Sequence, residues 1–151
     1  MSGTRLRTAR NADVPALQAL VAGAFAPFTA RTGIRPAPVD TDWETVVWAL
    51  GAVVATRDDR IVGVLVLWPH PDHVLVETLA VAPEEQGRGI GSALLDRAEL
   101  TAIESGTNAV RLYTNARMTE ALAYHPRRGY TEIGRERVHG FARVLFEKRL
   151  G

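Results

Sequence analysis

The stretch 84–95, EEQGRGIGSALL, contains the residue types in this sequence that are best suited to binding an anion. Its glycines occupy alternate positions, Gly87, Gly89 and Gly91, between an apolar strand-like run and a helix-like run. A helix N-terminus attracts phosphate through unpaired N–H groups and a partial positive charge, and glycines let those amides approach an anion without an intervening Cβ. Arg88 can add a charge-assisted contact. The stretch therefore predicts a phosphate-binding turn.

The spacing of these glycines excludes two common nucleotide-binding motifs. A nucleotide P-loop needs GxxxxGK followed by Ser or Thr, and the stretch has no such lysine; the dinucleotide fingerprint GxGxxG is not matched either. The pattern that is present is Gln-x-x-Gly-x-Gly, at Gln86, Gly89 and Gly91. Taken alone, such a turn is as often structural as ligand-binding, so its context decides its interpretation.

The composition limits the class of protein. A length of 151 residues, 46% of them hydrophobic, is enough to bury the core of one domain, so we expect a single domain over residues 1–151. The net charge of +1, with acids interspersed among the arginines, favours neither nucleic acid nor an anionic membrane as a partner. The absence of cysteine excludes disulfides, thiolate nucleophiles and cysteine-ligated zinc. With no signal-peptide pattern and no apolar run near the roughly 18–20 residues of a membrane span, we expect a cytoplasmic protein.

The hydrophobic periodicity predicts one mixed α/β domain with a largely antiparallel sheet. A strand at 5–9 precedes an amphipathic helix that runs to Phe25, and the breaker-rich segment 27–40 is expected to be a long irregular loop with room for one helical turn. A capping box of Thr41 and Glu44 predicts the start of a second helix. The later elements are strands at 52–56, 61–68 and 74–81, a helix at 89–105, a strand at 109–114, a helix within 118–128, and strands at 130–136 and 141–150.

In this setting the chain resembles the GNAT superfamily of N-acetyltransferases. The segment LAVAPEEQGRGIGSALL is similar to the acetyl-CoA motif of that superfamily, and NARMTEALAYHPRRGY is similar to its second signature, Asn … Ala-x-x-x-Tyr … Gly-Phe or Gly-Tyr. The order of elements is similar over nearly the whole chain. The resemblance implies a single-domain, GNAT-like α/β (α+β) fold, with a mixed, mostly antiparallel central sheet flanked by about four helices.

The resemblance also implies where acetyl-CoA binds. The pantetheine arm is expected to pair with the backbone of Leu79, Ala80 and Val81, and Asn115 matches the signature asparagine that contacts this arm. The pyrophosphate is expected on the amides of Gln86, Gly87, Arg88, Gly89, Ile90, Gly91 and Ser92. The residues by themselves agree, because free strand backbone accepts an extended ligand and ligands of open α/β sheets bind at the carboxyl ends of strands.

Acetyl transfer to an amine requires that the amine lose a proton and that the developing oxyanion be stabilised. Glu77 is the charged residue in the otherwise apolar run VLVETLAV, and strand alternation places it on the same face as Leu75 and Leu79. It is the candidate general base, although an exposed or arginine-paired glutamate has the same pattern. The backbone amide of Val81 is the candidate oxyanion donor.

The candidate general acid is where the sequence departs from the family pattern. Counting back from Gly129 and Tyr130, the usual catalytic tyrosine falls on His125, with Tyr124 as its neighbour. Adjacent helical residues point about 100° apart, so we expect only one of them to face the sulfur. His125, Tyr124 and the absence of a dedicated acid remain as alternatives.

Three further histidines have less specific patterns. His70 and His73 flank Asp72 in PHPDH, a spacing that can bind a divalent ion, but so short a cluster is usually incidental and we expect no functional metal. His139 lies in the loop between the last two strands and is expected to be solvated. The segments 26–48 and 135–140 are expected to shape the acceptor pocket, and their mixed charges select no particular acceptor.

The interpretation is an acetyl-CoA-dependent N-acetyltransferase that moves an acetyl group to a primary amine by direct transfer in a ternary complex, without a metal. The alternative is a non-catalytic acetyl-CoA-binding or regulatory module, which the missing tyrosine at position 125 motivates. A toxin that acetylates charged tRNA is disfavoured by the charge of +1. The final strands could pair between subunits, so a homodimer is compatible with the sequence.

Overall fold

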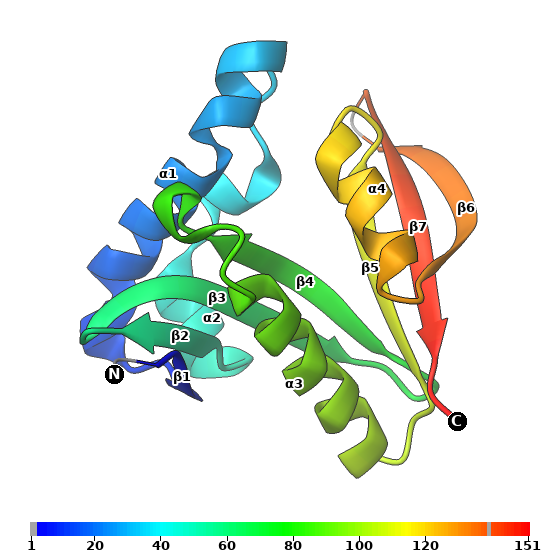
Figure 1. Cartoon of the computed structure of the whole chain (residues 1–151), viewed down its shortest axis with the longest axis horizontal. Helices are drawn as coiled ribbons and strands as arrows, with labels where there is room; N and C mark the ends of the chain where they lie inside the picture. The colour runs from blue at the N-terminus through cyan, green and yellow to red at the C-terminus, as the bar shows by residue number, and fades with distance from the viewer. Residues whose placement is uncertain (1–2, 139) are drawn as a thin grey trace. The chain divides into compact units, whose positions relative to one another are not determined.

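The computed structural model describes residues 3–138 and 140–151, so the expectation for His139 lies outside the described residues. Within these described residues, seven strands form one sheet in the order β1-β2-β3-β4-β5-β7-β6 (Figure 1). The pairs β1–β2, β2–β3, β5–β7 and β6–β7 are antiparallel, whereas β4–β5 is parallel. The expected mixed, mostly antiparallel sheet with four α-helices is confirmed.

The strands are β1 (Arg5–Thr8), β2 (Val53–Arg57), β3 (Arg60–Pro69), β4 (Val74–Val81), β5 (Ala109–Asn115), β6 (Thr131–Val138) and β7 (Phe141–Arg149). The helices are α1 (Val14–Thr32), α2 (Trp43–Ala49), α3 (Ile90–Glu104) and α4 (Thr119–Arg127), with short 3-10 turns η1 (Asn11–Asp13), η2 (Ala37–Asp40) and η3 (Pro83–Glu85). The chain divides into a first unit, Met1–Leu67 with Thr78–Arg97, and a second unit, Trp68–Glu77 with Ala98–Gly151. The expectation of one functional domain stays a prediction.

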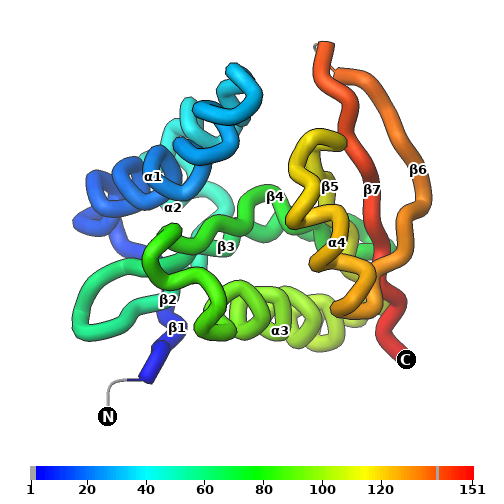
Figure 2. Tube along the Cα trace, turned by 45° about the horizontal axis from the view of Figure 1, so that its top comes forward, coloured from blue at the N-terminus to red at the C-terminus, as the bar shows by residue number. Residues whose placement is uncertain are grey.

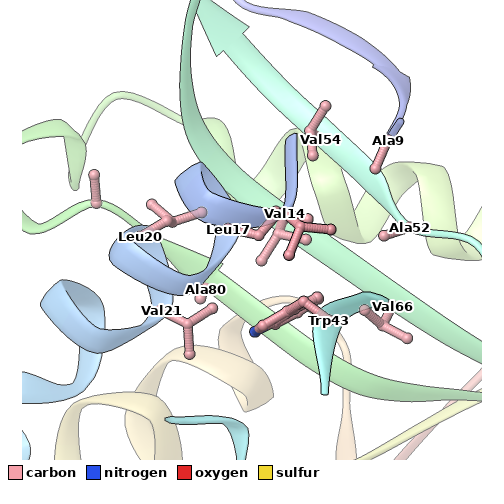
Figure 3. Packing of buried hydrophobic residues seen from close by; sticks show 12 residues of the cluster. Ala9, Val14, Leu17, Leu20, Val21, Trp43, Ala52, Val54, Val66 and Ala80 are labelled. Atoms are coloured by element: carbon pink, nitrogen blue, oxygen red, sulfur yellow. The ribbon is translucent and has the colours of Figure 1, made fainter. Parts of the chain in front are cut away.

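The core of the first unit lies where α1 and α2 pack on the sheet. Leu17 and Val21 of α1 and Trp43 of α2 are almost fully buried and meet Val54 of β2 and Ala80 of β4 (Figure 3). A buried tryptophan or leucine of this kind contributes several kcal/mol, since truncation to alanine removes about 2–5 kcal/mol. This cluster therefore fixes the end of β4 from one face.

β3 is buried on both faces, which explains its nearly continuous apolar sequence. Val64 and Val66 belong to the cluster beneath α1, whereas Gly63 faces the start of α3. A Cβ at Gly63 would lie 3.0 Å from Cγ2 of Ile90 and 3.1 Å from Cδ1 of Leu94. Figure 2 shows α1 and the first turns of α3 on opposite sides of these strands. The missing side chain lets α3 sit close to β3.

In the second unit, α4 lies beside the strands β5, β7 and β6 (Figure 1). β5 pairs with β7 from Ala109 to Asn115, and β6 pairs with β7 with a register shift between Glu132 and Gly134. The ring of His125 on α4 lies 5.5 Å from that of Phe146 on β7, so α4 is anchored through an aromatic contact.

Two local expectations are wrong. The helix α1 does not end before Pro27 but continues to Thr32, where Gly33 terminates it in the left-handed region (φ 75°) and donates to Thr29 O. The ring of Pro27 removes one helical hydrogen bond, and the flanking turns keep the helix intact. The helix α2 is capped by Asp42, which accepts from Thr45 N, rather than by Thr41.

Candidate active site

The segment 82–89 between β4 and α3, the glycine turn, has the left-handed backbone conformation at two of its residues that its glycines predict. After η3, Gly87 (φ 83°) and Gly89 (φ 82°) both adopt the left-handed region, which residues with a Cβ rarely enter. Apart from each glycine and its two chain neighbours, no described atom lies within 4 Å of the position that a Cβ would take at Gly87 or Gly89, so the space beside the turn is open. The turn therefore has both the conformation and the room to present amides to an anion.

Two contacts fix this turn at its ends. The side chain of Gln86 donates from Nε2 to Val81 O (3.3 Å), which ties the turn back to the strand. The side chain of Ile90 is buried beneath the gap left by Gly63 and anchors the start of α3. A hydrogen bond from Ala93 N to Gly89 O (3.0 Å) joins the end of the turn to the first turn of α3. The amides of Ile90 and Gly91 lie in that first helical turn, where N–H groups have no partner within the helix.

The strand β4 alternates between buried and accessible residues along its length. Ala80 is buried in the core, whereas Leu79 and Val81 are half-buried on the opposite face. Glu77 shares that second face and is exposed. The position of Glu77 thus fits the predicted alternation.

The ladder between β4 and β5 consists of the pairs Val74–Val110, Leu75–Arg111 and Val76–Leu112. β4 itself continues to Val81. The three residues predicted to pair with the pantetheine arm therefore lie beyond this ladder, on the part of β4 that leads into the glycine turn.

Asn115 is the last residue of β5 and organises the turn that follows. Its Oδ1 accepts from Arg117 N (2.9 Å), and its carbonyl accepts from Met118 N (2.9 Å). The side-chain oxygen is therefore engaged locally, and the amide nitrogen is the part of Asn115 that remains to contact a ligand.

His125 lies in the core of the second unit. It is 7% exposed, and its Nδ1 is buried without a hydrogen bond to any described residue. The rings of Tyr124, Tyr130 and Phe146 surround it at 5.5–5.9 Å. Burial, followed by the charge of Arg128, lowers the pKa of His125 from 6.5 to about 4. His125 is therefore a neutral imidazole at physiological pH.

The neighbouring side chains divide between the core and the accessible face of α4. Tyr124 is half-buried, whereas Tyr130 is 2% exposed. Burial, with the nearby charge of Glu99, raises the pKa of the Tyr130 hydroxyl well above its usual range. Glu99 accepts from Lys148 Nζ (3.0 Å) and pairs with Arg128 (3.4 Å). Tyr130 and Glu99 are thus neighbouring ionisable groups.

The sequence reasoning missed Glu85, which lies in the glycine turn and is 6% exposed. Three guanidinium groups approach its carboxylate, from Arg57 (3.6 Å), Arg60 (3.7 Å) and Arg88 (3.4 Å). The adjacent Glu84 is exposed. Because the two neighbouring residues are identical, the sequence alone does not indicate which of them is buried. The hydrogen bond from Ala82 N to Val62 O (2.9 Å) brings the start of β3 beside the end of β4.

The histidine pair of the β3–β4 turn forms a ring stack. The rings of His70 and His73 lie 4.4 Å apart at 7°, and His73 Nδ1 lies 2.7 Å from Asp72 Oδ1. Within residues 3–138 and 140–151, no three His, Cys, Asp or Glu side chains are placed to hold a metal ion. In the same part of the chain, every helix is too short or too polar to cross a membrane.

The sequence matches a known protein family. The family model for the acetyltransferase (GNAT) family matches residues 17–130. A mycothiol acetyltransferase of Jonesia denitrificans is 35% identical over 78 residues, which are 50% of this chain and 25% of that protein, so the chain spans about a quarter of that relative's length.

Solved structures show the same fold. A GNAT-family structure from Desulfovibrio desulfuricans has a TM-score of 0.81 at 19% identity and covers 99% of this chain and 100% of its own. The PaiA N-acetyltransferase of Thermoplasma acidophilum, in complex with coenzyme A, has a TM-score of 0.77 at 18% identity and covers 97% and 99%. Because the family model covers most of the sequence, the expected membership of this family is confirmed. The chain belongs to the GNAT family of acetyltransferases.

Proposed function

We propose that this acetyltransferase moves the acetyl group of acetyl-CoA to a primary amine by direct transfer in a ternary complex. The observation that carries the proposal is the turn after β4, where Gly87 and Gly89 take left-handed conformations beside open space and lead into the N-terminus of α3. A pyrophosphate on the amides of residues 86–92 would meet the positive end of a helix of 15 residues.

The pantetheine arm would then extend along β4. The backbone of Leu79, Ala80 and Val81 lies beyond the ladder to β5 and is suited to bind an extended ligand as an added strand. Gln86 already donates to the carbonyl of Val81, so the amide of Val81 is the polar group of that residue left for the thioester oxygen. Asn115 remains the predicted contact of the arm through its amide nitrogen.

In the reaction, the amine nitrogen attacks the thioester carbonyl, the amide bond forms, and the carbon–sulfur bond breaks to release coenzyme A. Glu77 is exposed on the accessible face of β4 and is the proposed base that accepts the amine proton, directly or through water. The amide of Val81 would stabilise the oxyanion.

For protonation of the departing thiolate, we propose Tyr124 rather than His125. With a pKa of about 4, His125 carries its proton in only about one molecule in a thousand at pH 7, and its ring is enclosed by other aromatic side chains. Tyr124 is half-buried on the same helix. The register would then differ by one residue from the family pattern.

Release of the coenzyme A thiol, measured across simple amines, amino acids and peptide N-termini, tests the function. Binding of acetyl-CoA together with turnover of at least one amine is expected, and binding without turnover would support the non-catalytic alternative. Glu77→Gln should retain acetyl-CoA binding and lower kcat by about 100-fold or more. Tyr124→Phe should lower kcat, whereas His125→Leu should not; the reverse result would return the acid role to His125.

Calorimetric titration tests the binding site separately. A Gly89→Glu variant places a Cβ in a left-handed position and a carboxylate beside the predicted pyrophosphate, so it should abolish acetyl-CoA binding. If the wild-type protein binds no acetyl-CoA, the enzyme interpretation of the turn is wrong.

A further inference from the structure

Glu85 is a buried acid in the predicted pyrophosphate turn, and the turn alone does not require it. Its side chain is 8% exposed, and Oε2 accepts no hydrogen bond from the described part of the chain. Burying a carboxylate is costly unless other charges or hydrogen bonds compensate. An acid at this place also repels an anionic ligand, so its presence needs an explanation.

The compensation comes from three arginines on three different segments. Arg57 ends β2, Arg60 begins β3, and Arg88 lies between the two left-handed glycines. Their nitrogen atoms lie 3.6, 3.7 and 3.4 Å from the carboxylate oxygens, longer than a usual charge-assisted hydrogen bond. The carboxylate thus holds the guanidinium groups electrostatically without engaging their hydrogen-bond donors at short distance.

The arginines differ in how accessible they are. The side chain of Arg57 is 24% exposed, whereas those of Arg60 and Arg88 are 67% and 51% exposed. Arg60 and the exposed Glu84 also line a cleft of about 560 Å³ between α1, the β2–β3 hairpin and η3. Arg88 is therefore held at its Nε end by a buried acid while much of its side chain remains open to solvent.

We propose that Glu85 is a positioning residue for coenzyme A binding, which holds Arg88 over the turn in the orientation that meets the ligand phosphates. Arg57 and Arg60 offset the charge of Glu85 so that it does not repel the phosphates. A free arginine side chain loses conformational entropy on binding, and a side chain that is already oriented loses less. This inference rests on the proposed function, since it concerns the same phosphate site.

The sign of one substitution separates positioning from simple electrostatics. Glu85→Gln removes a negative charge beside an anion site, so electrostatics alone predicts tighter coenzyme A binding. Positioning through Arg88 predicts weaker binding, and we expect the Kd for coenzyme A to rise at least fivefold. Glu84→Gln, the same change on the exposed neighbour, is the matched control and should leave the Kd unchanged or lower it.

A double-mutant cycle tests whether Glu85 acts through Arg88. Arg88→Gln alone should weaken binding, and adding Glu85→Gln to it should cause no further weakening, because the group to be positioned is gone. If the fold-increases in Kd of the two single variants multiply in the double variant, the proposal is overturned. Glu85→Asp keeps the charge and retracts it by one methylene; it should weaken binding by an intermediate factor, and it serves in place of Glu85→Gln where that variant does not fold.

The outcomes distinguish failure of this inference from failure of the proposed function on which it rests. Absence of coenzyme A binding by the wild-type protein would overturn the proposed function and the inference together. Wild-type binding combined with unchanged or tighter binding by Glu85→Gln would overturn the inference alone and leave the glycine turn as the phosphate site.

Discussion

The buried histidine of α4 makes a quantitative prediction for stability. The pKa of His125 is about 4 in the folded chain, against 6.5 for an unperturbed histidine. Between these values the unfolded chain binds a proton that the folded chain does not, so the free energy of unfolding falls as the pH is lowered from about 6.5 towards 4. From pH 7 to pH 5 the loss attributable to this group is about 2 kcal/mol, at about 1.4 kcal/mol for each unit of pKa difference.

The perturbation is His125→Leu, which removes the titrating ring and keeps an apolar side chain against Tyr130 and Phe146. Its Nδ1 makes no hydrogen bond with the described residues, so the substitution leaves no partner of that atom unpaired. Urea unfolding followed by far-UV circular dichroism at pH 7 and pH 5 gives the free energy of unfolding of both proteins. The wild-type value should fall by about 2 kcal/mol more than that of the variant.

The control for this experiment is Arg127→Gln, an exposed change in the same last turn of α4. It should shift the free energy of unfolding by a similar amount at both pH values. Equal pH dependence of the wild-type protein and His125→Leu would refute the assignment of a buried neutral imidazole, and with it the preference for Tyr124 as the general acid.

Four further substitutions test the fold and the turn, each by urea unfolding. Gly63→Ala should lower the free energy of unfolding by about 1–3 kcal/mol, because its Cβ would lie 3.0 Å from the side chain of Ile90; an unchanged value would mean that α3 shifts freely. Gly89→Ala should cost about 1–2 kcal/mol through its positive φ, whereas Gly23→Ala in α1, whose Cβ also meets no described atom, should be neutral or stabilising. The hydrogen bond from Arg7 lowers the pKa of Asp13 from 3.8 to about 2. The variant Asp13→Asn should therefore be less stable than the wild-type protein by about 2 kcal/mol at pH 7, and this difference should vanish as the pH falls from about 4 to 2.

The sequence predicts the fold well because two signals agree for most of its elements: the hydrophobic periodicity within the element, and the glycine, proline or capping residues at its ends. The strand β4 and the helix α3 are predicted within a residue or so, since Pro83 and the glycines separate two clear apolar patterns. The extent of α1 is missed because Pro27 is a breaker by propensity, whereas packing on the sheet outweighs the loss of one hydrogen bond. The true stop signal, Gly33, was present in the sequence.

The candidate site is only partly readable from the sequence. Backbone-mediated features follow from the glycine spacing, so Gly87 and Gly89 could be named in advance. Burial of single polar side chains could not, because it depends on segments that are distant in the sequence. Glu84 and Glu85 are adjacent and identical, yet only Glu85 meets the arginines of β2 and β3. The enclosure of His125 by β7 likewise depends on a contact with a residue 21 positions away.

The two outer strands of the sheet bear on how copies of this protein behave at high concentration. β1 is only four residues long, and β6 is exposed on both faces, with a bulge near Ile133 and charged residues such as Glu132 and Arg135. Edge strands that are short, bulged or charged disfavour backbone pairing between copies, which is the step that starts fibril formation. We expect concentrated solutions to resist amyloid-like aggregation, and self-association to use side-chain surfaces rather than a sheet extended from copy to copy.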